Sequence, residues 1–229
     1  MFIRSFPAGV WQTNCYVVAT QANAECVIID PGYESLPQIS EIIANYGLKP
    51  IATLLTHGHL DHMWSVQPLA SGYDIPAFIA SGDRHLLTNP AAGISAETIA
   101  MLAEAFGTEN KFIEPSDVRE IDAGKKIEIA GLQIDIRLAP GHTQGSVIFG
   151  INGDEPAFFT GDVLFAGAIG RTDLPGGSAD QMNVTLREVI LPLDDATEIF
   201  PGHGPATTMA NERVNNPYLR RIARGLSAV

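Results

Sequence analysis

The feature that most constrains the fold of this chain is residues 56–62, THGHLDH, which hold three of its six histidines. They directly follow the apolar run 51–55, which is typical of a short buried strand. Side chains two positions apart in an extended segment point the same way, so His57 and His59 can bind one ion together. Gly58 between them allows a close turn of the backbone beneath the two rings. Imidazole and carboxylate ligands together suit zinc, iron or manganese.

After this segment we predict a helix over 63–71, whose start turns Asp61 and His62 toward a second, neighbouring position. Three further segments each place a His or an Asp beside glycine, just after a predicted strand. They are Pro140-Gly141-His142, Thr160-Gly161-Asp162 and Pro201-Gly202-His203-Gly204. Loops at the strand ends of two packed sheets converge at one edge. Each segment alone is ordinary turn chemistry, but the four together predict one metal site.

Strand-like and helical segments alternate along the chain in two similar halves. Predicted helices cover 36–46 with Gly47 at the end, 96–106 with Gly107 at the end, 179–190, and 211–226 with an interruption near Pro217. Predicted strands include 14–20, 25–30, 51–55, 76–80 and 198–200, with hairpins at Ala130-Gly131 and Asn152-Gly153. This alternation predicts one domain over residues 1–229, in which two sheets pack face to face with helices outside.

Composition narrows the setting and the partners. With 26 acidic and 14 basic residues the net charge is −12, which disfavours nucleic acid and anionic membranes as partners. Residues 1–7 lack the features of a signal peptide, and no apolar run reaches the roughly 20 residues of a membrane span. Cys15 and Cys26 are expected to be buried free thiols, with a disulfide between neighbouring strands as the alternative. We therefore expect a cytoplasmic protein.

The four segments, in this order, resemble the motifs of the metallo-β-lactamase fold superfamily, with its His-x-His-x-Asp-His signature. The resemblance covers roughly residues 10–205. Asn14-Cys15-Tyr16, Asp30-Pro31-Gly32 and the segment 170–177, GRTDLPGG, look closer to the glyoxalase II-like branch, which includes small hydroxyacylglutathione-hydrolase-like proteins and the related persulfide dioxygenases. The resemblance implies an α/β fold, an αββα sandwich of two mixed β-sheets with outer helices.

The resemblance also implies a cofactor of two divalent transition-metal ions, with zinc as the first choice and iron or manganese as alternatives. It assigns His57, His59 and His142 to the first ion, Asp61, His62 and His203 to the second, and Asp162 to a bridging position between them. Asp61 and Asp162 would in addition guide the proton of the attacking water. Asp30 would support the histidine segment from behind, and the alternative is a plain turn-opening aspartate.

Other polar and aromatic residues receive weaker predictions. Arg171 and Asp173 lie in the glycine-rich loop 170–177, and we expect them to form a substrate-side wall in which Arg171 binds an anionic group. The alternative is an internal salt bridge that shapes the loop. His85 lies outside every motif and is predicted to be a surface residue. Trp64 is predicted to pack in the core or at the rim, close to the site.

The resemblance implies a metallo-hydrolase, a thioesterase of the glyoxalase II type. Its partner would be a small-molecule thioester of a 2-hydroxy acid, such as S-lactoylglutathione, cleaved by metal-bound hydroxide. A thiolate leaving group suits a chain without a motif for a strong general acid, since a thiol has a pKa of about 8.5. Residues 163–171 lack the Lys and Tyr that glutathione-binding relatives place there, which leaves Arg171 as the nearest cation.

Three alternatives remain at this stage. A persulfide dioxygenase would use mononuclear iron held by His57, His142 and Asp162. Another superfamily hydrolase would act on lactams, lactones or nucleic acid, although the acidic charge disfavours RNA. A non-enzymatic metal-binding module is the third, and seven converging ligands argue against it.

Overall fold

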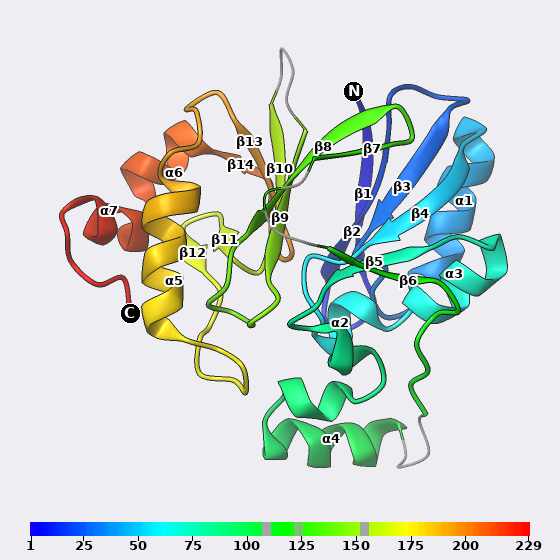
Figure 1. Ribbon diagram of the computed structural model, residues 1–229, viewed down its shortest axis with the longest axis horizontal. Helices are drawn as coiled ribbons and strands as arrows, with labels where there is room; N and C mark the ends of the chain where they lie inside the picture. Colours follow the sequence, from blue (N-terminus) through cyan, green and yellow to red (C-terminus); the bar gives the residue numbers. More distant parts are fainter. Residues whose placement is uncertain (107–110, 122–123, 125, 152–155) are drawn as a thin grey trace.

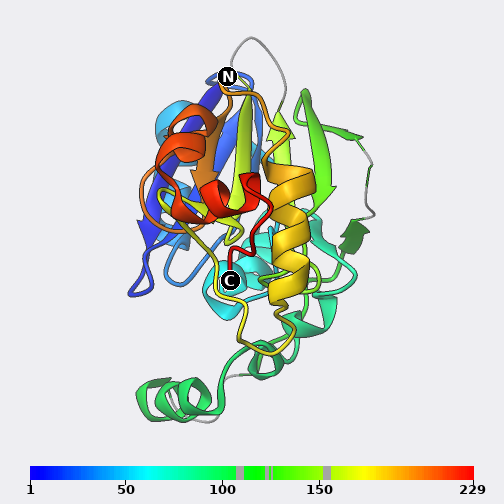
Figure 2. The same cartoon turned by 90° about the vertical axis from the view of Figure 1, so that its left-hand side faces the viewer.

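Two six-stranded sheets face each other, and helices cover the outer face of each sheet (Figure 1). The computed structural model describes residues 1–106, 111–121, 124, 126–151 and 156–229. The layers follow the predicted order of helices, sheet, sheet and helices. In both views α4 projects from the body at the end of the molecule opposite the N-terminus (Figures 1 and 2).

The first sheet takes its strands from the N-terminal half, in chain order: β1 (Phe2–Ala8), β2 (Thr13–Ala19), β3 (Glu25–Ile29), β4 (Lys49–Leu54), β5 (Ala77–Ala80) and β6 (Val118–Ile121). β1 to β3 are antiparallel neighbours, whereas β3 to β6 run parallel. The carboxyl ends of β3, β4 and β5 therefore lie at one edge. In open α/β sheets this is the edge where ligands bind.

The second sheet has the order β14 (Thr207–Thr208), β13 (Glu198–Pro201), β10 (Ala157–Gly161), β9 (Val147–Ile151), β8 (Leu132–Leu138) and β7 (Lys126–Ile129). β8 and β10 are both antiparallel to β9, and β13 is parallel to β10. β8, β10 and β13 consequently run in one direction, and their carboxyl ends share an edge. A separate small sheet pairs β11 (Leu164–Phe165) with β12 (Ala168–Ile169).

Strand β2 shows why the central strands are continuously apolar, since both of its faces are buried. Tyr16 and Val18 point into the core between the sheets, where they meet Phe149 of the second sheet. Cys15, on the opposite face, packs in a second core with Ile39 of α1. A third core lies between the second sheet and its helices. The three cores hold the four layers in place.

The helices are α1 (Leu36–Tyr46), α2 (Leu60–Met63), α3 (Val66–Tyr73), α4 (Ala96–Phe106), α5 (Ala179–Thr185), α6 (Met209–Asn215) and α7 (Pro217–Ala223), with 3₁₀ turns η1 (Arg84–Leu87) and η2 (Pro90–Gly93) and a π-helical turn η3 (Leu186–Ile190). The predicted helix 36–46 is confirmed, and Gly47 ends it with a left-handed φ of 61°. The predicted end of α4 at Gly107 lies outside the described residues. None of the described helices has the length and apolarity of a bilayer-spanning segment.

The predicted helix 63–71 is wrong at its start. α2 ends at Met63 and α3 begins at Val66. The backbone N–H of Ser65 donates to the carbonyl of Pro31 at 2.9 Å, and the Ser65 hydroxyl donates to the carbonyl of Gly32 at 2.7 Å. These long-range bonds take Ser65 out of the helical ladder, and periodicity does not reveal them.

Other differences concern short elements. The two-residue strands β11 and β12 and the four-residue strand β6 were not predicted, because such lengths carry no usable periodicity. The hairpin at Ala130-Gly131 is confirmed, with φ of 55° and 69° at its two turn residues. β9 and β10 pair as predicted, while their turn at Asn152-Gly153 lies outside the described residues. The closing helix is interrupted as predicted, between α6 and α7.

Candidate metal centre

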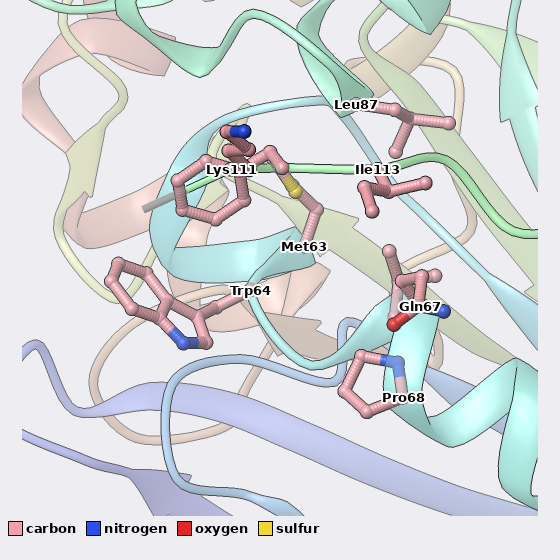
Figure 3. Close-up of a pocket in the computed structure, with 9 residues that line it drawn as sticks. Met63, Trp64, Gln67, Pro68, Leu87, Lys111 and Ile113 are labelled. Atoms are coloured by element: carbon pink, nitrogen blue, oxygen red, sulfur yellow. The ribbon is translucent and has the colours of Figure 1, made fainter. Parts of the chain in front are cut away.

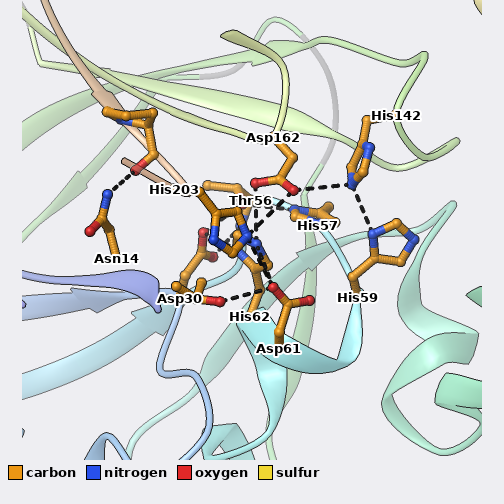
Figure 4. A network of polar contacts seen from close by, with 12 residues as sticks. Asn14, Asp30, Thr56, His57, His59, Asp61, His62, His142, Asp162 and His203 are labelled. Atoms are coloured by element: carbon orange, nitrogen blue, oxygen red, sulfur yellow. Dashed lines mark hydrogen bonds and ion pairs between the residues drawn. The ribbon is translucent and has the colours of Figure 1, made fainter. Parts of the chain in front are cut away.

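The seven predicted ligands meet where the strand ends of the two sheets converge (Figure 4). They form three overlapping groups, in each of which the ligand atoms lie within 4.8 Å of one another. The groups are His57 with His59 and His142, His57 with His62 and Asp162, and Asp61 with His62 and His203. The segment after β4 supplies four of these residues and the loops of the second sheet supply three. Neither sheet alone contains the set.

The first group joins His57 and His59 of one sheet to His142 of the other. Nδ1 of His59 lies 2.8 Å from Nε2 of His142, and the ring centroid of His57 lies 4.8 Å from each of the other two rings. Nδ1 of His142 lies 2.8 Å from the carbonyl oxygen of Arg171. A carbonyl only accepts, so this nitrogen carries the proton and Nε2 presents its lone pair to the group.

The second group contains His62, Asp61 and His203. Oδ2 of Asp61 lies 3.4 Å from Nε2 of His62 and 3.1 Å from Nε2 of His203. Asp162 lies between the two groups, because its Oδ1 is 3.2 Å from Nε2 of His62 while its Oδ2 is 3.5 Å from Nε2 of His142. A carboxylate placed in this way can contribute one oxygen to each of two ions.

Some of the metal-binding atoms of the site have no hydrogen-bond partner within the described part of the chain. Nε2 of His57 and Nε2 of His59 are buried and make no hydrogen bond there. Nε2 of His62 and Oδ1 of Asp162 are also buried, and they face each other at 3.2 Å. Unpaired buried polar atoms are rare because each costs about 1–3 kcal/mol. Imidazole nitrogens and carboxylate oxygens are ligands for divalent transition metals. The donor set therefore fits metal ions, and the first and second groups, with Asp162 between them, are consistent with a binuclear site.

The charges at the site favour the forms that bind metals. Burial, with the neighbouring His62, lowers the pKa of His57 well below its ordinary value. Burial also lowers the pKa of His59 to about 4, so both rings are neutral at neutral pH. Burial alone would raise the pKa of Asp61 and of Asp162, but the charges of His62 and His203 and the hydrogen bonds to these carboxylates together outweigh burial and lower both.

His62 behaves in the opposite way. Burial would lower its pKa, but the carboxylates of Asp61, Asp162 and Asp30 raise it well above the ordinary value. A proton on His62 thus balances part of the negative charge of the site. A bound cation would displace that proton, since a ligating ring must be neutral.

A shell of supporting groups orients the candidate ligands. The Asp30 carboxylate accepts from the backbone N–H of Thr56 at 2.8 Å and from its hydroxyl at 2.6 Å. The other contact of Asp30 is with Nδ1 of His62 at 2.9 Å, which directs Nε2 of that ring into the site. Asp30 thus lies behind the histidine segment, at the position that the resemblance implies for it.

The supporting contacts of two residues, Thr13 and Asn14, were not anticipated. The Thr13 hydroxyl donates to Oδ2 of Asp61 at 2.8 Å. Asn14 donates through Nδ2 to the carbonyls of Pro201 and Gly204, at 3.0 and 2.8 Å, on either side of His203. The polar pair Thr13-Asn14 at the start of an apolar strand was the available signal, although its partners are far away in sequence.

Arg171 and Asp173 form the internal ion pair that was the alternative to a substrate wall. Nε of Arg171 lies 2.7 Å from Oδ1 of Asp173, and a second bond joins the same groups. The pair is exposed, with 59% and 67% of the two side chains accessible. The backbone carbonyl of Arg171, rather than its side chain, contacts the candidate site through His142.

A hollow of about 180 Å³ lies beside α2, lined by Met63, Trp64, Gln67, Pro68, Leu87, Lys111 and Ile113 among others (Figure 3). Trp64 packs edge-on against Tyr33 and Phe112, with ring centroids 4.8 and 5.2 Å away. The prediction of a packing role for Trp64 is confirmed. None of the seven candidate ligands lines this hollow.

Residues 8–203 match the family described as the metallo-beta-lactamase superfamily. This chain belongs to that superfamily. An uncharacterized protein of Mycobacterium tuberculosis is 42% identical over 98% of this chain and 100% of its own length. Hydroxyacylglutathione hydrolase GloC of Haemophilus influenzae is 33% identical over 96% of this chain and 98% of its own length. The latter match supports the glyoxalase II-like branch of the superfamily.

Solved structures of the superfamily show the same fold. The BLEG-1 B3 metallo-beta-lactamase has a TM-score of 0.83 and 33% identity, covering 95% of this chain and 99% of its own. TTHA1623, solved in a di-iron-bound form, has a TM-score of 0.76 and 32% identity, covering 95% of this chain and 100% of its own. The family and the His/Asp groups make this superfamily member a metal-dependent hydrolase.

Proposed function

We propose that this superfamily hydrolase cleaves thioesters of 2-hydroxy acids, such as S-lactoylglutathione or the same acyl group on another small thiol. The observation that carries the proposal is that Asp162 lies between a group of three histidines and a group of two histidines and an aspartate. The relative GloC, named a hydroxyacylglutathione hydrolase, supports the substrate class. The net charge of −12 fits a small-molecule substrate better than nucleic acid or an anionic membrane.

In this proposal each group of ligands holds one divalent ion, and Asp162 contributes to both. His57, His59 and His142 hold the first ion, and Asp61, His62 and His203 hold the second. Such ions lower the pKa of a coordinated water from about 15.7 toward 7 and polarise a carbonyl oxygen. Zinc suits these ligands, and so does iron, which the similar structure of TTHA1623 contains.

The side chains orient the reactants and accept the proton. Asp61 is held as a carboxylate because His62, His203 and the Thr13 hydroxyl together outweigh burial and keep its pKa low, and that hydroxyl fixes one of its oxygens. Asp162 is likewise held as a carboxylate, since the charges of His62, His142 and His203 and a hydrogen bond from His62 together outweigh burial and keep its pKa low, and a carboxylate can accept a hydrogen bond from the attacking water. The leaving thiolate needs little protonation, since a thiol has a pKa of about 8.5.

A substrate screen tests the proposal. Protein of measured metal content is assayed with S-lactoylglutathione, with glutathione persulfide in an oxygen electrode, and with a β-lactam. We expect acyl release from the thioester without oxygen uptake. Oxygen consumption with the persulfide would instead indicate a mononuclear-iron dioxygenase, for which three of the seven residues suffice. Hydrolysis of the lactam alone would move the chain toward the lactamases.

A further inference from the structure

We propose that Asp83 is a positioning residue for the first metal group, holding the segments of His57, His59 and His142 in register across the two sheets. The inference rests on the proposed binuclear site. Asp83 follows β5 and is buried, with 1% of its surface accessible. Its side chain contacts no metal-binding atom, so any effect on the ions passes through the two loops that it binds.

The topology explains why an aspartate at this place can reach the site. The sheet order β3-β4-β5 puts the end of β4, which leads into residues 56–62, between the ends of its two parallel neighbours. Asp30 follows β3 and binds the segment from one side through Thr56 and His62. Asp83 follows β5 and binds residues 56–62 from the other side through Gly58. The histidine segment is thus held between two buried carboxylates.

The contacts of Asp83 reach both segments at once. Its Oδ2 accepts from the backbone N–H of Gly58 at 2.9 Å, between the two histidines of the first group. The same oxygen accepts from the Thr143 hydroxyl at 2.6 Å, next to His142. Its Oδ1 accepts from the backbone N–H of Gly145 at 2.8 Å. One carboxylate therefore links all three ligands of the first group through neutral donors.

The hydroxyl network around Thr143 strengthens this link. Because Thr143 donates its one proton to Asp83, its oxygen can only accept from Ser146, whose Oγ lies 2.7 Å away. Ser146 Oγ in turn accepts from the backbone N–H of Thr143 at 3.1 Å. The loop after His142 is thereby closed on itself and tied to Asp83.

Close backbone packing leaves little freedom for the loops to shift. A Cβ added at Gly58 would lie 2.9 Å from the Asp83 carbonyl oxygen, and one added at Gly145 would lie 2.6 Å from the Asp83 nitrogen. Both segments thus contact the Asp83 backbone as well as its carboxylate. A substitution of Asp83 should therefore alter the positions of His57, His59 and His142. The supporting contacts of Asp61, His62 and His203 do not involve Asp83 and should remain.

The test compares metal affinities of wild type, Asp83→Asn and Thr143→Val by chelator competition, with the electronic spectrum of the cobalt-substituted protein as a second readout. The Asn amide keeps the size of the side chain but replaces one acceptor oxygen by a donor. Thr143→Val removes one donor and leaves the carboxylate, and it serves if Asp83→Asn does not fold. We expect affinity for one of two ions to fall about 10–100-fold, as for other supporting residues, with an altered cobalt spectrum.

Glu212→Gln is the matched control. Glu212 is fully buried, and its donors among the described residues are neutral, including the Thr207 hydroxyl at 2.8 Å and the Gly167 N–H at 2.8 Å. It should lower the melting temperature without changing either metal affinity. Wild-type affinities and spectrum in the Asp83 and Thr143 variants, or equal losses in Glu212→Gln, would overturn the positioning role. Failure of the wild-type protein to bind two ions would overturn the binuclear proposal itself. This outcome is distinct from the failure of the positioning role of Asp83.

Discussion

Three of the five candidate ligand rings are oriented by the hydrogen bond of the other ring nitrogen. His142 donates to the carbonyl of Arg171, and His62 is held by Asp30. Nδ1 of His57 lies 3.1 Å from the Thr56 hydroxyl. Such contacts fix the tautomer and the direction of the ligating lone pair. The orientation of these three rings is thus set by residues that are not themselves candidate ligands.

His59 and His85 give the sharpest contrast between single residues. His59 is buried within the first group, whereas His85 is exposed on η1. We expect His59→Ala to lower kcat/KM for thioester hydrolysis by more than about 100-fold, because a direct ligand matters more than a supporting one. His85→Ala should remain within about twofold of wild type. Steady-state kinetics at equal added zinc measure both, and similar losses would contradict the assignment of His59.

Spacing and resemblance were enough to name the seven converging residues, because each lies in a short motif that contains glycine. They could not name Thr13 or Asp83. Thr13 and its partner Asp61 are 48 positions apart, and Asp83 and Thr143 are 60 apart. An isolated polar residue at a strand end gives no sign of such a distant partner. Supporting residues become visible only when the two sheets are packed.

At the scale of elements, strong local signals gave good boundaries. The helices at 36–46 and 96–106 have the predicted bounds because apolar periodicity fixes them. The helix at 63–71 failed because tertiary bonds to Ser65 outweigh its local preference. The partners of Ser65 lie more than 30 positions earlier in the chain, so a local pattern could not report them.

The glycines Gly47 and Gly72 should respond to alanine in opposite directions. Gly47 has φ of 61° at the end of α1, and an added Cβ would lie 2.3 Å from Oδ1 of Asn23. Gly47→Ala should lower the free energy of unfolding by about 1–2 kcal/mol. Gly72 lies in α3, and a Cβ added there would meet open space. Gly72→Ala should therefore raise the free energy of unfolding by about 0.5–1 kcal/mol. Denaturant unfolding measures both, and a stabilising Gly47→Ala would refute the strain.

The thiols of β2 and β3 predict a pH effect. Cys15 and Cys26 are free and buried, and burial raises the pKa of Cys26 to about 12. The unfolded thiol ionises near 8.5, so this contribution to stability is complete below that pH and is lost as pH rises toward 12. Native protein at pH 8 should react slowly with a disulfide reagent, whereas in unfolded protein both thiols should react with it rapidly. Rapid modification of folded protein would contradict the burial.

At the scale of the whole molecule, the site exists only because the two sheets are joined. Beyond the ligands themselves, Tyr16 of the first sheet donates through its hydroxyl to the carbonyl of Pro201 at 2.6 Å. Asn14 adds two bonds to the same loop. The isolated halves would each carry an incomplete set of ligands, so metal binding should report on the packing of the complete molecule.

The distribution of cations predicts which thiol carrier is preferred. Arg171, the only cation in residues 163–171, is already paired with Asp173, and Arg213 is paired with Asp195. A carboxylate-bearing thiol therefore finds fewer charge-assisted bonds, each of about 1.5–3 kcal/mol. We expect kcat/KM for S-lactoylglutathione to lie roughly two to four powers of ten below that of a dedicated glutathione-binding enzyme. Kinetics with the lactoyl group on several thiols test this, and a near-diffusional value for the glutathione ester alone would contradict it.

Titration of metal-free protein with zinc, followed by thioester hydrolysis and elemental analysis, bears most directly on the assignment of a two-ion thioesterase. We predict that hydrolysis of S-lactoylglutathione is absent without metal and rises until two ions are bound per chain. Asp162→Ala should retain fewer than two ions and show little activity, because Asp162 lies between both groups. Hydrolysis by the metal-free protein, or full binding of two ions by Asp162→Ala, would contradict the assignment.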